Sequence, residues 1–261
     1  MPFGHPLPPD LQYVALIAVS SALALILGAY VYLPAGKRLG MIREFVTTDW
    51  KYLGVAWTIT VVINNVAKFH VEETFTDTVH ELEGSTVAVF QTVTAEPLTM
   101  LFGAVYLVGF PFIVLFTYFK LKVHCPEQAR RYAIAYVCLV LIAAPFFLLF
   151  PVHVVGYEVA AVEPLLYEFH PVIEAGAGAT DTLMKAFPSL HTGLSVLAAV
   201  YAQKTDRRYA RMAAVMAVAI VVSTFYLGIH WLSDAGIAVV MVGIAYWISQ
   251  TVERTAWRAS V

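Results

Sequence analysis

Long apolar runs separated by short polar clusters make up most of this chain. Seven of these runs come close to the roughly 20 residues that a helix needs to cross the hydrocarbon core of a membrane. A β-barrel does not fit runs of this length, because its strands need only about 9 to 11 alternating residues. The pattern therefore predicts an all-α, polytopic membrane helical bundle with about seven transmembrane helices, at about 11–34, 51–68, 98–119, 132–152, 188–203, 210–229 and 234–252.

Composition supports a membrane protein, since 60% of the 261 residues are hydrophobic and 13% are charged, whereas soluble domains carry about 25% charged residues. The N-terminus has no basic region and the first run is too long for a signal peptide, so we expect it to remain as a membrane anchor. Cys125 and Cys138 read as ordinary thiols. Without an internal repeat or a linker, residues 1–261 are expected to form a single integral membrane domain.

Basic residues are distributed unevenly among the connections between the runs. If the runs alternate across the bilayer, one set of connections holds 14 of the 16 lysines and arginines, and the other set holds only Lys68 and Lys185. By the positive-inside rule, the N-terminus is expected outside and the C-terminus in the cytoplasm. The acidic connection 70–93 is expected on the outer side as an amphipathic surface helix, which could also cover the site described next.

Two polar clusters lie at the outer ends of predicted helices. KAFPSLHTG, from Lys185 to Gly193, taken alone is typical of a helix start, with a proline in the first turn and a capping serine. STFYLGIHWLSD contains His230 and Asp234 at a spacing of four, which places them on one helical face. Ionisable residues at membrane depth are costly and therefore indicate function. We expect the two clusters to converge on one site.

The two clusters resemble signatures of the type 2 phosphatidic acid phosphatase superfamily, which read P-S-G-H and S-R-x-x-x-x-x-H-x-x-x-D. Leu190 replaces a glycine and Thr224 replaces an arginine. These variants are most similar to the inositol phosphorylceramide synthase-like (inositolphosphotransferase) branch, which carries F-P-S-L-H and a serine-threonine pair. The resemblance covers about 95–250, the expected catalytic core, and implies a six-helix phosphatase core preceded by one N-terminal helix.

Carried over by position, the resemblance implies a role for each residue of the clusters. His230 would be the nucleophile that takes the phosphoryl group, and Asp234 would hold its ring. His191 would protonate the leaving alcohol and then activate the acceptor, while Ser189 would bind a phosphate oxygen. General chemistry agrees, because a neutral imidazole is a competent nucleophile near pH 7 and a helix N-terminus is an anion site.

The family's first signature, K-x-x-x-x-x-x-R-P, is absent. Between Pro151 and Phe187 the only basic side chain besides histidine is Lys185, and with Thr224 in place of arginine two phosphate-clamping guanidiniums are missing. A transferring phosphoryl group needs positive charge nearby. Lys185 is the first candidate to supply it, although an interfacial lysine that merely reaches toward water is the alternative. Weaker candidates are Lys68, His70 and His153.

The predicted function is an integral membrane enzyme that cleaves a lipid phosphoester or pyrophosphate at the extracytoplasmic face through a phosphohistidine, without a cofactor or metal. The lipid phosphate is the substrate, water or an alcohol or polyol is the acceptor, and no nucleic-acid partner is expected. One alternative is a metal-dependent membrane hydrolase with His191, His230 and Asp234 as ligands. A non-catalytic lipid carrier or channel is another, and the oligomeric state is not indicated.

Overall fold

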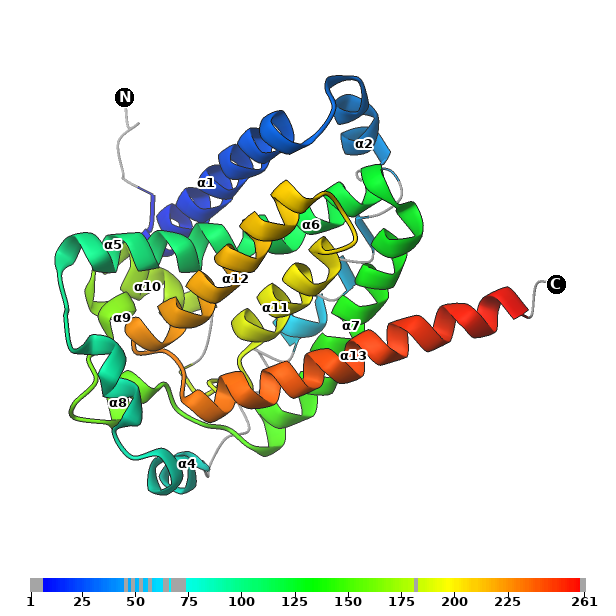
Figure 1. Cartoon of the computed structure of the whole chain (residues 1–261). Helices are drawn as coiled ribbons and strands as arrows, with labels where there is room; N and C mark the ends of the chain where they lie inside the picture. Colours follow the sequence, from blue (N-terminus) through cyan, green and yellow to red (C-terminus); the bar gives the residue numbers. More distant parts are fainter. Residues whose placement is uncertain are drawn as a thin grey trace, which may run out of the picture.

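The computed structural model describes residues 7–44, 47, 50–51, 54–55, 58–62, 66, 74–180 and 183–258. The regular secondary structure of these residues is helical, apart from one isolated β-bridge between Val152 and Lys185. Figure 1 shows the longer helices lying side by side as a bundle, with most of the short helices at one end. The prediction of an all-α polytopic membrane bundle is confirmed.

Five helices of the described chain are long and apolar enough to cross a membrane. One of them runs without a break over Glu96–His124 and contains a π-helical turn, η4, at Val105–Gly109 between α5, Glu96–Ala104, and α6, Phe110–His124. The other four are α1 (Pro9–Tyr32), α7 (Pro126–Leu149), α12 (Arg207–Tyr226) and α13 (Leu232–Arg258). These five correspond to the first, third, fourth, sixth and seventh predicted segments.

The two remaining predicted segments have different outcomes. The fifth is the helix α11, Leu190–Ala202, whose 13 residues are shorter than a full membrane span. The second, 51–68, lies largely outside the described residues. Although short, α11 is central, because it packs against α6, α7, α12 and α13 and its Leu197 and Ala198 are fully buried. The bundle thus surrounds the helix that begins with the first polar cluster.

Polar side chains inside the bundle find partners on neighbouring helices. The Tyr132 hydroxyl donates to the Val114 carbonyl at 2.9 Å, and the Tyr201 hydroxyl lies 2.6 Å from Ser249 Oγ. Apolar surroundings make an unpaired hydroxyl costly, so such bonds fix how the helices face each other. α1 contributes less to this core and exposes much of its apolar surface, as a lipid-facing helix does.

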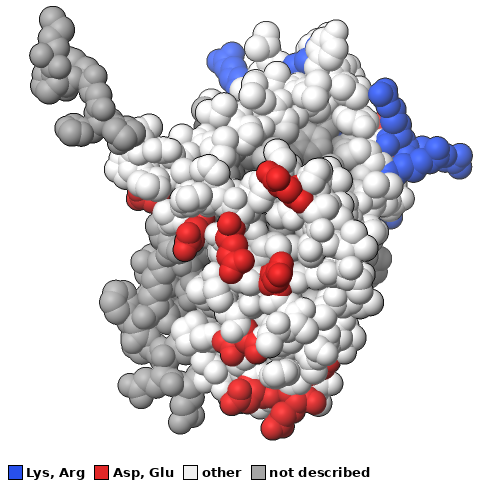
Figure 2. Space-filling view, turned by 90° about the vertical axis from the view of Figure 1, so that its left-hand side faces the viewer, with Lys and Arg blue, Asp and Glu red and all other residues white. Residues whose placement is uncertain are grey.

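The two ends of the bundle differ in charge. At one end, beside the turn η1 (Ala35–Lys37) and α2 (Arg38–Glu44), Lys120 pairs with Asp206 at 2.6 Å and donates to the Tyr32 carbonyl at 2.6 Å. The opposite end carries α4 (Thr76–Glu83), η3 (Thr86–Gln91), α8 (Val155–Glu158), α9 (Leu165–Glu168) and α10 (Pro171–Thr180). Acidic side chains gather on this side and blue lysines and arginines stay at the far edge (Figure 2). The separation follows the sequence pattern, and the orientation in the membrane stays a prediction.

The acidic connection is not one amphipathic helix in its described part. α4 ends at Glu83, and Gly84 has a φ of +56°, a left-handed conformation that glycine adopts without the strain of a side chain. The chain then turns into η3. The start of α4 is held to the bundle, because the Phe75 N–H donates to the Pro151 carbonyl at 2.9 Å. The segment therefore forms two short helices that pack on the acidic end.

Candidate active site

The turn between α12 and α13 presents His230. Gly228 has a φ of +71°, and a Cβ at this position would lie 2.3 Å from the Glu163 carbonyl oxygen. Only glycine fits, both for its backbone conformation and for this close approach. The neighbouring loop holds the turn through its backbone, because the Gly156 N–H donates to the Gly228 carbonyl at 2.9 Å.

The Gln91 side chain also holds this turn in place, through hydrogen bonds to backbone groups. Its Nε2 donates to the carbonyls of Glu163 and Tyr226, each at 2.8 Å, and its Oε1 accepts the Glu163 N–H at 2.7 Å. A single side chain of η3 therefore connects the loop before α9 to the end of α12. The position of His230 is determined by segments that are far apart in the sequence.

His230 and Asp234 form a buried pair. The Nδ1 atom of His230 lies 3.1 Å from Oδ2 of Asp234, which also accepts the Trp231 N–H at 2.8 Å. Asp234 is fully buried and His230 is 4% exposed. α13 begins at Leu232, so the pair spans the helix start and is not within one helix face as predicted. Because Nδ1 faces the carboxylate, Nε2 is the nitrogen available to a substrate.

His191 lies in the first turn of α11 and is held by two aromatic side chains. The Tyr106 hydroxyl is 3.2 Å from Nδ1 of His191, and the two rings stack with centroids 4.2 Å apart. The Phe110 ring centroid is 4.3 Å from that of His191. Tyr106 belongs to the π-helical turn η4, and such turns frequently occur at functional sites. The imidazole is thereby fixed in orientation.

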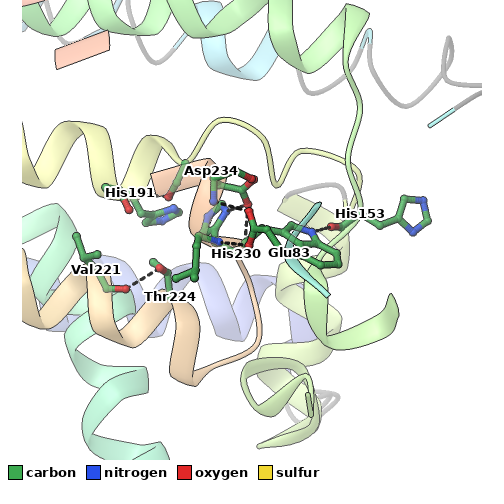
Figure 3. Close-up of polar contacts among 12 residues, drawn as sticks. Glu83, His153, His191, Val221, Thr224, His230 and Asp234 are labelled. Atoms are coloured by element: carbon green, nitrogen blue, oxygen red, sulfur yellow. Dashed lines mark hydrogen bonds and ion pairs between the residues drawn. The ribbon is translucent and has the colours of Figure 1, made fainter. Parts of the chain in front are cut away.

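The two histidines line one cavity of about 230 Å³, and their ring centroids lie 6.3 Å apart. Figure 3 shows both rings in the same neighbourhood, contributed by different segments. Lys185 is the only lysine or arginine among the described residues of the wall, which is otherwise largely apolar and aromatic, with Tyr136, Phe147, Leu194 and Tyr167.

The partners of the two histidines differ in charge, and this separates their chemistry. The Asp234 carboxylate at Nδ1 of His230 is placed to stabilise that ring when it becomes cationic. The phenol of Tyr106 beside His191 is neutral and supplies no such charge. The geometry therefore suits a nucleophile at His230 and a proton donor at His191.

Ser189 is the N-cap of α11. Its Oγ accepts the Thr192 N–H at 3.2 Å, and it is 1% exposed. The described residues that line the cavity do not include it. Its own N–H donates to the Asp234 carbonyl at 3.2 Å, which joins the starts of α11 and α13. The structure thus shows Ser189 as the capping residue of α11, which agrees with the simpler interpretation of the P-S-L-H motif, and its phosphate-binding role stays a prediction.

Thr224 occupies the position of the family arginine and faces its own helix. Its hydroxyl donates to the Val221 carbonyl at 2.7 Å, and the side chain is fully buried (Figure 3). A threonine bonded in this way supplies no positive charge to a phosphate. The compensating charge has to come from elsewhere in the chain.

Two of the four candidate cations lie in the described part of the chain, and of these Lys185 lines the cavity whereas His153 does not. Lys185 reaches the cavity from a backbone bridge to Val152, and its Nζ lies 5.7 Å from the centroid of the Phe147 ring. His153 pairs with Glu158 at 2.6 Å and is directed away from His230 in Figure 3. The remaining two candidates lie outside the described residues: Lys68 and His70.

Sequence reasoning missed several residues of the site. Tyr106 lies in an apolar run and Gln91 in a polar connection, and neither has a local pattern that distinguishes it from its neighbours.

As for the metal alternative, the described part of the chain contains no group of three or more His, Cys, Asp or Glu side chains arranged to hold a metal ion.

Comparison with known proteins gives one match. A family model described as the PAP2 superfamily matches residues 73–248, more than half of the chain. No curated protein and no solved structure matches. The matched region begins just before α4 and includes His191, His230 and Asp234, whereas α1 precedes it.

Proposed function

The chain belongs to the PAP2 superfamily of membrane phosphatases and phosphotransferases, and on this premise we propose that it cleaves a lipid phosphoester or pyrophosphate through a phosphohistidine at His230. One observation carries the proposal. Two histidines face the same 230 Å³ cavity, and one has a carboxylate at Nδ1 whereas the other has a phenol.

In the first step, Nε2 of His230 attacks phosphorus and the bond from phosphorus to the leaving oxygen breaks. The imidazolium of His191 gives its proton to that oxygen, so the lipid alcohol leaves neutral. Asp234 stabilises the cationic phosphohistidine and holds the ring in the required orientation. Lys185 and the N–H groups at the start of α11 compensate the charge on the phosphoryl oxygens.

In the second step, neutral His191 takes a proton from the acceptor hydroxyl, which attacks phosphorus and breaks the phosphorus–nitrogen bond. His230 is then neutral and His191 is again an imidazolium, so the cycle closes. With water as acceptor the enzyme is a phosphatase. With an alcohol or polyol it is a phosphotransferase, which the F-P-S-L-H and serine-threonine features of the inositolphosphotransferase-like branch favour.

The charge distribution supports a site on the extracytoplasmic face. The starts of α11 and α13, next to which His191 and His230 stand, lie toward the acidic end of the bundle, whereas Lys120 pairs with Asp206 at the start of α12, near the opposite end (Figure 1). Lysine and arginine accumulate on cytoplasmic connections. An apolar and aromatic cavity at such a depth suits the first part of a lipid tail next to its phosphate.

A headgroup-release screen of the purified protein tests the proposal. Phosphatidate, an isoprenyl pyrophosphate and a phosphoinositide are supplied as labelled lipids, with and without free inositol. We expect release or transfer from one of these classes, abolished in His230→Ala and unaffected by excess chelator. Turnover that survives in His230→Ala contradicts the proposal, and loss in chelator that zinc restores favours the metal-dependent hydrolase.

A further inference from the structure

A carboxylate from a distant helix holds the first turn of α13. Glu83, the last residue of α4, accepts the Leu232 N–H at 2.8 Å through Oε2 and the Ser233 N–H at 2.6 Å through Oε1. The contact joins residues 149 and 150 positions apart. Figure 3 shows the Glu83 side chain beside His230 and Asp234.

The first N–H groups of a helix have no partner within the helix, and a neighbouring residue usually caps them. At the start of α13, Asp234 accepts the N–H of Trp231, which precedes the helix, and Glu83 accepts the N–H groups of the next two residues. Negative charge at a helix N-terminus is also favourable because of the helix dipole. Three successive backbone amides are therefore fixed by two carboxylates, one local and one from α4.

We propose that Glu83 is a positioning residue for the nucleophile, an inference that rests on the proposed function of His230. His230 lies two residues before Leu232, and Asp234 directly follows Ser233. Glu83 thus holds the backbone between the two members of the catalytic pair. Loosening these amides lets the His230 ring move relative to the phosphoryl group, and a displacement of about 1 Å can cost about a hundredfold in rate.

A second contact network makes the role of Glu83 distinct from general anchoring. The start of α4 is attached through Phe75 and through Thr76, whose Oγ1 accepts the His153 N–H at 3.0 Å. Trp231 is fully buried and its indole donates to the His153 carbonyl at 2.9 Å. The contacts of Phe75 and Thr76 do not involve the Glu83 carboxylate, so we expect its removal to affect the amides next to His230 and to leave the start of α4 attached.

Orthovanadate is the probe, because it binds as a trigonal-bipyramidal mimic of the transition state. Calorimetric titration of the full-length protein in detergent gives its dissociation constant and, separately, the fraction of binding-competent molecules. We compare Glu83→Gln, which keeps one acceptor oxygen, Glu83→Ala, which keeps none, and Glu81→Gln, an exposed acidic residue of the same helix, as control.

We expect vanadate affinity to fall about tenfold to a hundredfold in Glu83→Ala, less in Glu83→Gln, and not in the control. In the lipid assay kcat falls in parallel while KM stays unchanged, as for an interaction realised in the transition state. A dissociation constant equal to that of wild type in Glu83→Gln overturns the inference, as does a loss confined to the fraction of competent molecules. If Glu83→Ala does not fold, Glu83→Gln decides.

His230→Ala separates this inference from the proposed function. When His230→Ala abolishes vanadate binding and Glu83→Gln binds as wild type does, only the positioning role fails. When His230→Ala binds vanadate and turns over lipid as wild type does, the phosphohistidine proposal fails and the inference about Glu83 fails with it.

Discussion

Asp234→Asn removes a negative charge from the site and puts an amide NH₂ in place of one carboxylate oxygen. The asparagine has nearly the same shape, and its side-chain oxygen can accept the same Trp231 N–H that Oδ2 accepts at 2.8 Å. What disappears is the negative charge beside Nδ1 of His230. Since the proposed intermediate is a cationic phosphohistidine, the substitution should slow its formation far more than it disturbs the fold.

The magnitude follows from the distance between the two groups. Unit charges separated by the 3.1 Å between His230 Nδ1 and Asp234 Oδ2 attract by about 5 kcal/mol at an effective dielectric constant of about 20. A neutral hydrogen bond of about 1 kcal/mol can persist with asparagine, leaving a loss of about 4 kcal/mol. At 1.36 kcal/mol per factor of ten, phosphoenzyme formation should slow about a thousandfold.

Single-turnover quench with labelled lipid measures that rate independently of product release. Oδ1 of Asp234 is buried and has no hydrogen-bond partner among the described residues, so the new amide NH₂ there is an unsatisfied donor that costs about 1–3 kcal/mol of stability. Rates are therefore normalised to competent sites by vanadate titration. Glu174→Gln, at an exposed position on α10, is the control for loss of an acidic charge. A normalised rate within tenfold of wild type would refute the electrostatic role of Asp234.

Three further substitutions test separate parts of the site. Tyr106→Phe keeps the ring that stacks on His191 at 4.2 Å and removes the hydroxyl. Hydrolysis of substrates with poor leaving groups should therefore slow about fivefold, while the rate with p-nitrophenyl phosphate, which has a good leaving group, should change little. Equal losses of rate with both kinds of substrate contradict the role of His191 as an acid. Lys185→Ala should lower kcat/KM about a hundredfold or more, whereas Lys185→Arg should retain most of the activity. A kcat/KM of Lys185→Ala equal to that of wild type shows that the lysine is only interfacial. In intact cells an impermeant thiol reagent should label Glu174→Cys, which is exposed at the acidic end, and not native Cys125; the opposite labelling reverses the orientation.

Hydrophobic patterning predicted the long helices but not their ends. The fourth segment was expected from 132, whereas α7 starts at Pro126 and includes Glu127 and Arg131, which pair with each other on the helix surface. Such a polar first turn is helical but not apolar, so a hydrophobicity pattern does not register it. For the same reason α13 continues past 252 as a helix to Arg258.

The residues of the site could be predicted where chemistry and spacing are both local. His230 and Asp234 are four residues apart and do form a pair, although the pair spans the start of a helix. By contrast, Tyr106 meets His191 across 85 positions, and Glu83 reaches α13 across 149. Those partners depend on how helices pack, and neither residue differs locally from the apolar or acidic run around it.

Direct detection of a phosphohistidine at His230 is the decisive measurement. Labelled lipid is mixed with the enzyme, quenched in alkali, and the label is located by peptide mapping. We expect a label that is stable to alkali, labile to acid, carried by the peptide that contains His230, and absent from His230→Ala. Product formed in a single turnover without any enzyme-bound label, or a label on a different side chain, would contradict nucleophilic catalysis by His230.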